Sequence, residues 1–170
     1  MRILDVGTGG ADLPLAFARR GWHSVAVDHN PAVLEVARDA ANGHGLVEVG
    51  AADGRSLPYA DASFDIAHSS LLIHHLREGE AVRLLREMHR VARVGVVVND
   101  LRRGPLAFLA TALPTLALSR SHVTRHDGIA SARRAYTLSE LDDLLDEAGL
   151  VPVWRSSRWL PRVATAAVAS

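Results

Sequence analysis

The hydrophobic and polar positions of this chain follow two alternating patterns. Short apolar runs predict five strands covered on both faces, at residues 2–6, 23–28, 46–52, 64–69 and 94–98. Apolar residues at helical spacing predict helices at residues 12–20, from residue 31 onwards, and at 78–93. The pattern further predicts a helix at 106–118 that Pro114 would bend, a helix from 137 to 148, and strands at 151–154 and 163–168.

Local signals mark several helix ends. Asn30 before Pro31 is typical of an N-cap followed by a first-turn proline, and Thr137 with Glu140 forms a capping-box pattern. Because strands and helices alternate, we predict a doubly wound α/β fold with a mostly parallel sheet and helices on both faces. A length of 170 residues fits a single domain.

The composition narrows the functional classes. The formal net charge is zero, so no basic field indicates nucleic-acid binding. The chain has no cysteine, no leader pattern, and no apolar run long enough to span a membrane. The nine histidines do not cluster with carboxylates at metal-ligand spacing, so we predict no metal site. We therefore expect a cytoplasmic enzyme.

A glycine-rich turn follows the first predicted strand. Residues 3–12 read ILDVGTGGAD, and helical spacing begins directly afterwards. A strand that ends in glycines and leads into a helix can present backbone N–H groups to an anionic or nucleotide-like ligand. Gly7 and Gly9 supply two of the three glycines of a dinucleotide-binding fingerprint, and Asp12 occupies the place of the third.

Acidic residues stand at the ends of several predicted strands. In a doubly wound sheet the ligand binds beyond the carboxyl ends of the strands, where this sequence places Asp5, Asp28, Asp53 and Asp100. Asp28 follows Gly9 at the sequence separation typical of a ribose-binding acid. Asp53 could accept a hydrogen bond from the amino group of an adenine. The plainer alternative is that such residues only form turns and caps.

The combination of these segments resembles the class I S-adenosylmethionine-dependent methyltransferases. The matching segments are LDVGTGGADLP, VAVDHNP and AADGRSLPYADASFDIAHSSLLIHHL, and the similarity covers most of residues 3–100. The resemblance implies S-adenosylmethionine as cofactor and the strand order 3-2-1-4-5-7-6. One departure is Ala11, where many members of the family carry glycine.

The resemblance also implies a role for each site residue. The methionine part would be held at the glycine-rich turn and lined by serines after the fourth strand, the ribose by one acid, and the adenine by the next. Carried over to this sequence, these residues are Asp5, Gly7, Thr8 and Gly9, then Ser69 and Ser70, then Asp28, and finally Asp53 and Gly54 with His29 beside the adenine.

The remaining residues are expected to serve the methyl acceptor. Residues 3–100 would bind the cofactor, 101–136 would form a substrate lid, and 137–170 would supply the closing helix and strands. Among the arginines of this segment, Arg103, Arg120 and Arg125 are the expected lid residues. The segment resembles that of small-molecule methyltransferases near polyketide and quinone pathways, so we expect a phenolic, quinol or polyketide-type acceptor. The plainer alternative is a solvated arginine-rich surface. The chain contains arginine but no lysine, so a segment rich in arginine need not have a functional role.

A phenol has a pKa of about 10, so a positioned base would assist methyl transfer to its oxygen. His126 is the first candidate and His122 the second. His74 and His75 follow the fourth strand, where we expect a structural or pocket-lining role.

Two other functions stay open at this stage. A nicotinamide-dependent oxidoreductase would share the first strand, the glycine turn and Asp28, and a non-catalytic protein could bind S-adenosylmethionine alone. Family members usually carry N-terminal cap helices, whereas here the first strand begins directly after Met1. We therefore expect one of three situations: the true start lies upstream, a homodimer or a partner subunit covers the open N-terminal side, or the site is open and binds weakly.

Overall fold

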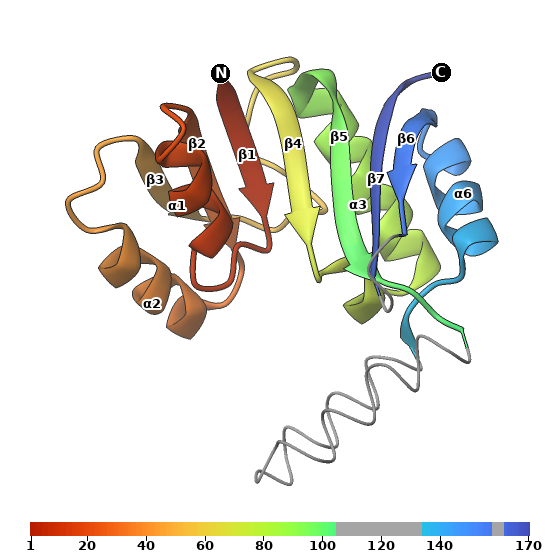
Figure 1. The fold of residues 1–170 in the computed structure, drawn as a ribbon, viewed down its shortest axis with the longest axis horizontal. Helices are drawn as coiled ribbons and strands as arrows, with labels where there is room; N and C mark the ends of the chain where they lie inside the picture. The colour runs from red at the N-terminus through yellow and green to blue at the C-terminus, as the bar shows by residue number, and fades with distance from the viewer. Residues whose placement is uncertain (105–133, 158–161) are drawn as a thin grey trace, which may run out of the picture.

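A single seven-stranded sheet organises the chain (Figure 1). The computed structural model describes residues 1–104, 134–157 and 162–170. The sheet order is β3-β2-β1-β4-β5-β7-β6, which confirms the predicted order and fold class. The strands are β1 (Arg2–Val6), β2 (His23–Asp28), β3 (Val47–Ala51), β4 (Phe64–Ser70), β5 (Ala92–Leu101), β6 (Leu150–Ser156) and β7 (Arg162–Ala169).

The strand directions bring one set of chain segments to one edge of the sheet. β1 to β5 run parallel to one another, whereas β7 pairs antiparallel with β5 and with β6. The carboxyl ends of β1, β4 and β5 therefore all lie at the lower edge in Figure 1, opposite the two termini. This edge is where a doubly wound sheet binds its ligands.

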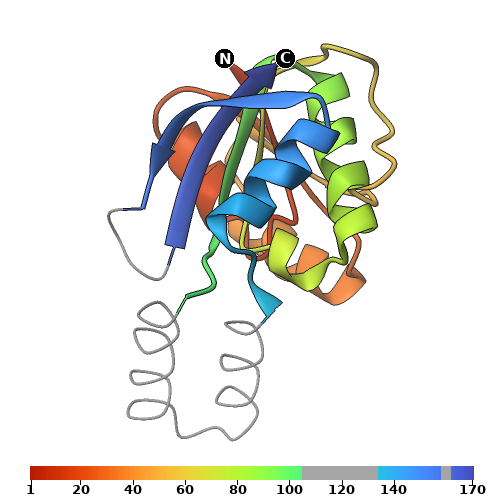
Figure 2. The ribbon, with the colours of Figure 1, turned by 90° about the vertical axis from the view of Figure 1, so that its right-hand side faces the viewer.

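Helices cover both faces of the sheet, as predicted. They are α1 (Asp12–Ala18), α2 (Pro31–Ala41), α3 (Glu78–Val91) and α6 (Leu138–Glu147), with one 3₁₀ turn, η1 (Ile73–His75). Figure 2 shows α3 and α6 together on one face and α1 on the other. The predicted caps are present, since the Asn30 side chain accepts from the Ala32 N–H and Thr137 pairs with Glu140.

The largest part of the core lies between α3 and the sheet. The apolar face predicted for this helix, Ala81, Leu84, Leu85, Met88 and Val91, is fully buried. It packs in one cluster with β-branched and aromatic residues of β1, β4 and β5. Burying one face of an amphipathic helix on a sheet is the main source of its stability, because a 14-residue helix alone is marginal in water.

Some predicted boundaries were wrong by a few residues. The helix predicted to reach residue 93 ends at Val91, and the strand predicted at 94–98 extends from Ala92 to Leu101. Polar Asn99 and Asp100 belong to this strand because they pair in register with Ala164 and Val163 of β7. The predicted helix at 106–118 lies outside the described residues.

In the described part of the chain, no helix is long and apolar enough to cross a bilayer.

Truncation of the α3 face should destabilise the domain measurably. Leu85 is fully buried, so Leu85→Ala should lower the free energy of unfolding by about 2–5 kcal/mol through lost burial and a residual cavity. Val36 is 59% exposed on α2, and Val36→Ala should change the free energy of unfolding by less than about 0.5 kcal/mol. Urea unfolding followed by circular dichroism measures both, and equal stabilities of the two variants would contradict this account.

Candidate functional site

A cavity of about 390 Å³ lies at the carboxyl ends of the central strands. Five of the ten predicted cofactor-binding residues line it, namely Gly7, Asp28, His29, Asp53 and Gly54. Apolar side chains complete its wall, among them Val6, Leu72, Leu76 and Leu84. An apolar cavity with a few convergent polar groups is the usual form of a small-molecule site.

The glycine-rich turn closes one side of the cavity, but its N–H groups are largely used inside the protein. The N–H groups of Gly7 and Thr8 both donate to the Val27 carbonyl, at 2.8 and 3.0 Å. The prediction that this turn presents bare N–H groups to a ligand is therefore wrong for these two residues. Their hydrogen bonds instead fix the turn to the end of β2.

Close packing explains two of the glycines. Gly7 has a φ of 73°, and a Cβ added there would lie 2.9 Å from a methyl of Leu72. At Gly54 an added Cβ would lie 2.7 Å from both Leu84 and Val6. Both glycines therefore let the backbone approach the cavity wall closely, which a larger side chain would prevent.

Asp28 ends β2 with its carboxylate held in place. Its Oδ1 accepts from the Asn30 N–H at 3.0 Å, and its Oδ2 lies 3.5 Å from the Gly9 N–H. The side chain is only 12% exposed, and His29 Nδ1 lies 3.6 Å from Oδ1. The turn-forming role and the cavity-lining role therefore coexist in this residue.

Asp53 meets the cavity through a network of charged groups. Arg55 donates to Asp53 from its backbone N–H and from its guanidinium, with three of these bonds at 2.9 Å, and its other arm reaches Glu80 of α3. Hydrogen bonds from the guanidinium, and then from the backbone of Arg55, lower the pKa of Asp53 to about 2. The network thus ties the end of β3 to the start of α3 across the cavity.

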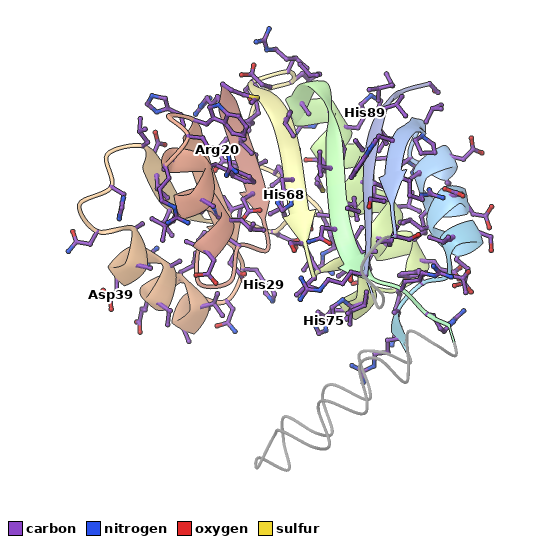
Figure 3. The ribbon with its side chains drawn as sticks, in the orientation of Figure 1. Arg20, His29, Asp39, His68, His75 and His89 are labelled. Atoms are coloured by element: carbon purple, nitrogen blue, oxygen red, sulfur yellow. The ribbon has the colours of Figure 1, made fainter. Side chains whose placement is uncertain are left out.

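Asp5 was predicted to bind the cofactor, but in the structure it pairs with a histidine of the neighbouring strand. Its buried carboxylate oxygen lies 2.6 Å from Nδ1 of His68, directly opposite it in the β1–β4 register. Figure 3 shows His68 within the sheet. A buried carboxylate requires such a partner, so Asp5 joins the two central strands, and among the described residues it is not part of the cavity wall.

The hydroxyl groups predicted around the methionine are likewise not part of the described cavity wall. The Oγ atoms of Thr8 and Ser69 are buried and have no hydrogen-bond partner among the described residues. Ser70 Oγ accepts from the side-chain amide of Asn99 at 3.2 Å. Thr8, Gly9, Ser69 and Ser70 therefore adjoin the site without lining it in the described part of the structure.

The turn after β4 carries two adjacent histidines. His74 is buried, with Nδ1 2.6 Å from Oδ1 of Asp100, whose Oδ2 accepts from the Ile73 N–H at 2.7 Å. His75 lines the cavity, and its ring centroid lies 4.0 Å from that of His74. The expectation was a structural or pocket-lining role for both residues; His74 is buried and paired with Asp100, and His75 lines the cavity.

The predicted substrate lid is described only at its two ends. Arg102 forms an isolated bridge with Tyr136, whose hydroxyl donates to the Leu76 carbonyl at 2.9 Å. Arg103 pairs with Glu140 at the surface. His122, His126, Arg120 and Arg125 lie outside the described residues.

Sequence reasoning missed two charged residues of the cavity wall, Arg55 and Glu80. Glu80 occupies the N3 position of α3, where its carboxylate accepts from the Arg77 N–H, and this position was readable from the sequence. The sequence alone does not predict that Arg55 and Glu80 line the same cavity, because they are 25 positions apart and only folding brings them together. Within residues 1–104, 134–157 and 162–170, no three His, Asp or Glu side chains are placed to hold a metal ion.

Comparisons with known proteins agree with this geometry. A methyltransferase domain model matches residues 4–98. An uncharacterised methyltransferase of Mycobacterium sp. strain JLS is 40% identical over 93 residues, covering 55% of this chain and 35% of that protein. A demethylmenaquinone methyltransferase of Clavibacter sepedonicus is 30% identical, covering 89% of this chain and 66% of that one.

A solved structure shares the whole fold. The crystal structure of an S-adenosylmethionine-dependent methyltransferase from Aquifex aeolicus superposes with a TM-score of 0.75 and 18% identity, covering all of this chain and 82% of that one. The chain spans between about a third and two thirds of the length of the two curated relatives. Because the domain model matches more than half of its residues, the chain belongs to the methyltransferase domain family.

Proposed function

We propose that this chain catalyses S-adenosylmethionine-dependent methyl transfer to a small molecule, with a phenol, a quinol or a polyketide-type hydroxyl as acceptor. The observation that carries the proposal is the cavity at the carboxyl ends of the strands, walled by Asp28 and Asp53 around an apolar centre. Its volume of about 390 Å³ lies within the range of small-molecule sites.

The chemistry of the wall fits the cofactor. Ribose hydroxyls and the adenine amino group are hydrogen-bond donors, and Asp28 and Asp53 offer carboxylate acceptors. Three carboxylates, those of Asp28, Asp53 and Glu80, face the cavity with Arg55, which suits a ligand that carries a positive charge. When bound, the cofactor supplies a methyl group already activated on a sulfonium, so the protein's task is alignment and exclusion of water.

The proposed acceptor class is supported by the name of one relative. The Clavibacter protein is described as a demethylmenaquinone methyltransferase and aligns with 89% of this chain. The segment 101–136 is proposed as the acceptor lid, and its two described ends meet next to the turn that carries His75. We further propose that the protein is cytoplasmic and that it acts as a homodimer or together with a partner subunit.

Two experiments test the function directly. Calorimetry with S-adenosylmethionine and with NAD(P)H should show saturable binding of the first, and binding of the nicotinamide alone would refute the proposal. Incubation with a labelled methyl donor and a panel of phenols, quinols and small acids should transfer label to a hydroxyl-bearing acceptor. Binding without transfer to any of them would favour a non-catalytic cofactor-binding protein.

Removal of the ribose acid should weaken cofactor binding selectively. Asp28→Ala should raise the Kd for S-adenosylmethionine about tenfold to hundredfold, because hydrogen bonds to a charged group contribute roughly 1.5–3 kcal/mol each. Asp39→Asn on the same side of the molecule should leave Kd unchanged, because Asp39 is exposed on α2 and points away from the site (Figure 3). Calorimetry compares the two, and an unchanged Kd in Asp28→Ala would exclude the ribose role.

The Asp53–Arg55 pair predicts a measurable pH effect. The pKa of Asp53 is about 2 in the folded protein, below its unfolded value, so its contribution to stability is present above about pH 4 and is lost as the pH falls towards 2. In Arg55→Met the pKa of Asp53 should rise towards its unfolded value, so the stability that is lost between about pH 4 and pH 2 should become smaller.

NMR titration of the Asp53 carboxyl carbon measures this shift. Arg38→Met, which removes an exposed arginine of α2, should leave the titration unchanged. An Asp53 pKa of about 2 that persists in Arg55→Met would show that the guanidinium is not its cause.

A further inference from the structure

The two carboxylates proposed to hold the cofactor are not equally free to accept further hydrogen bonds. Asp28 accepts from the Asn30 N–H at 3.0 Å with one oxygen, and its other oxygen lies 3.5 Å from the Gly9 N–H. Since a carboxylate offers about four sites to hydrogen-bond donors, Asp28 can still accept from ribose hydroxyls. The ribose end of the cavity is therefore open to its ligand in the free protein.

Asp53 differs because one arginine occupies both of its oxygens. Oδ1 accepts from the backbone N–H and from Nε of Arg55, both at 2.9 Å. Oδ2 accepts from Nη2 of the same residue at 2.9 Å and lies 3.2 Å from Nε. These contacts use about all the sites that one carboxylate offers. The amino group of an adenine can therefore reach Asp53 only in competition with the Arg55 guanidinium.

Glu80 gives this guanidinium a second carboxylate to bind. Nη1 of Arg55 already donates to Oε1 of Glu80, and Oε2 accepts from the Arg77 N–H at 3.2 Å. A guanidinium can donate two parallel hydrogen bonds to one carboxylate, so Glu80 has capacity for a stronger contact. The side chain of Arg55 is 40% exposed, which leaves it room to change rotamer. The guanidinium can thus leave Asp53 without losing its ionic partner.

We propose that Arg55 is a positioning residue of the adenine end of the cavity, which occupies Asp53 in the free protein and moves onto Glu80 when the cofactor binds. The inference rests on the proposed function, because it takes adenine as the group that donates to Asp53. It adds that Arg55 lowers the affinity for the cofactor and that Glu80 offsets this effect.

The opposite role for Arg55 would be to hold Asp53 ready for adenine. The two roles predict opposite signs, since removal of the guanidinium strengthens binding if it competes and weakens binding if it orients. S-adenosylmethionine is an unsuitable probe, because its positive charge alone would favour a site that has lost an arginine. Adenosine carries the same base and ribose without a charge, so it reports on the competition itself.

The first test removes the competitor. Arg55→Met should lower the Kd for adenosine about twofold to fivefold, the range expected for the loss of an exposed ion pair. Purine riboside lacks the amino group, so its Kd should not change. Arg38→Met, at an exposed arginine of α2, is the matched control and should leave both Kd values unchanged. In calorimetry, weaker or unchanged adenosine binding by Arg55→Met, or an equal gain for both ligands, would overturn the inference.

The second test removes the alternative partner. Glu80→Gln loses the charge but keeps a carbonyl oxygen for the Arg77 N–H, so the start of α3 should stay intact. It should raise the Kd for adenosine about twofold to fivefold, because the guanidinium then stays on Asp53. The double variant Arg55→Met/Glu80→Gln should bind like Arg55→Met, since Glu80 acts only through Arg55. Weaker binding by the double variant than by Arg55→Met would contradict the exchange.

The movement itself has a spectroscopic signature. The Nε–H signal of Arg55 in an NMR spectrum can be assigned by its disappearance in Arg55→Met. It should shift when adenosine is added and stay in place when methionine, which has no base, is added instead. An Nε–H signal that adenosine does not move would show that the guanidinium stays on Asp53.

The outcomes also distinguish this inference from the proposed function. If the wild type binds S-adenosylmethionine and adenosine while the variants leave the Kd for adenosine unchanged, the inference fails and the function stands. If the wild type binds neither ligand, the proposed function fails and the inference with it. Thermal unfolding of each variant confirms that a change in Kd does not reflect loss of the fold.

Discussion

The hydrogen bond between Asp5 and His68 lies at the centre of this fold. It joins β1 to β4 at a position where the two residues are directly opposite, and both are buried. Leaving either group without its partner would impose a desolvation penalty of about 1–3 kcal/mol or more, so the pairing strongly favours one register of the two central strands. The glycine-rich turn begins two residues after Asp5, and the turn that carries His74 and His75 begins shortly after His68. Both sides of the cavity therefore depend on this register.

Several carboxylates of this protein serve the backbone and the site together. Asp28 accepts from Asn30 while lining the cavity, and Asp53 accepts from the Arg55 N–H in the same way. A carboxylate has lone pairs for several donors, so one oxygen can hold a turn while the other faces a ligand. Orientation is thus fixed before any ligand arrives, which reduces the entropy lost on binding.

The sequence allowed much of the fold to be predicted, for clear physical reasons. Buried parallel strands are continuous apolar runs, and the apolar residues of α3 repeat at helical spacing. Both patterns can therefore be recognised in the sequence alone. The boundary between α3 and β5 was misplaced because Val91 and Ala92 suit either structure and only the pairing with β4 and β7 decides between them.

The site was predictable to the extent that it depends on strand ends. Asp28 and Asp53 could be identified because spacing along the chain marks where each strand stops. The partners of Asp5 and Asp100 could not be identified in this way. His68 lies 63 residues from Asp5, His74 lies 26 residues from Asp100, and each pair meets only in the folded protein. The glycine-rich turn shows the same limit, since the N–H groups of Gly7 and Thr8 donate to a carbonyl of the neighbouring strand.

The bridge between Arg102 and Tyr136 also has an evolutionary consequence. The two residues are far apart in the sequence, and the Arg103 N–H donates to the Tyr136 carbonyl at 2.9 Å. Once the two ends of a segment are fixed side by side, its length affects stability only weakly, because the entropy of loop closure grows slowly with residue number. A change in the number of residues between Arg102 and Tyr136 should therefore cost the sheet little stability. A gene for such a protein can therefore gain or lose codons in one continuous stretch at little cost to the stability of the fold.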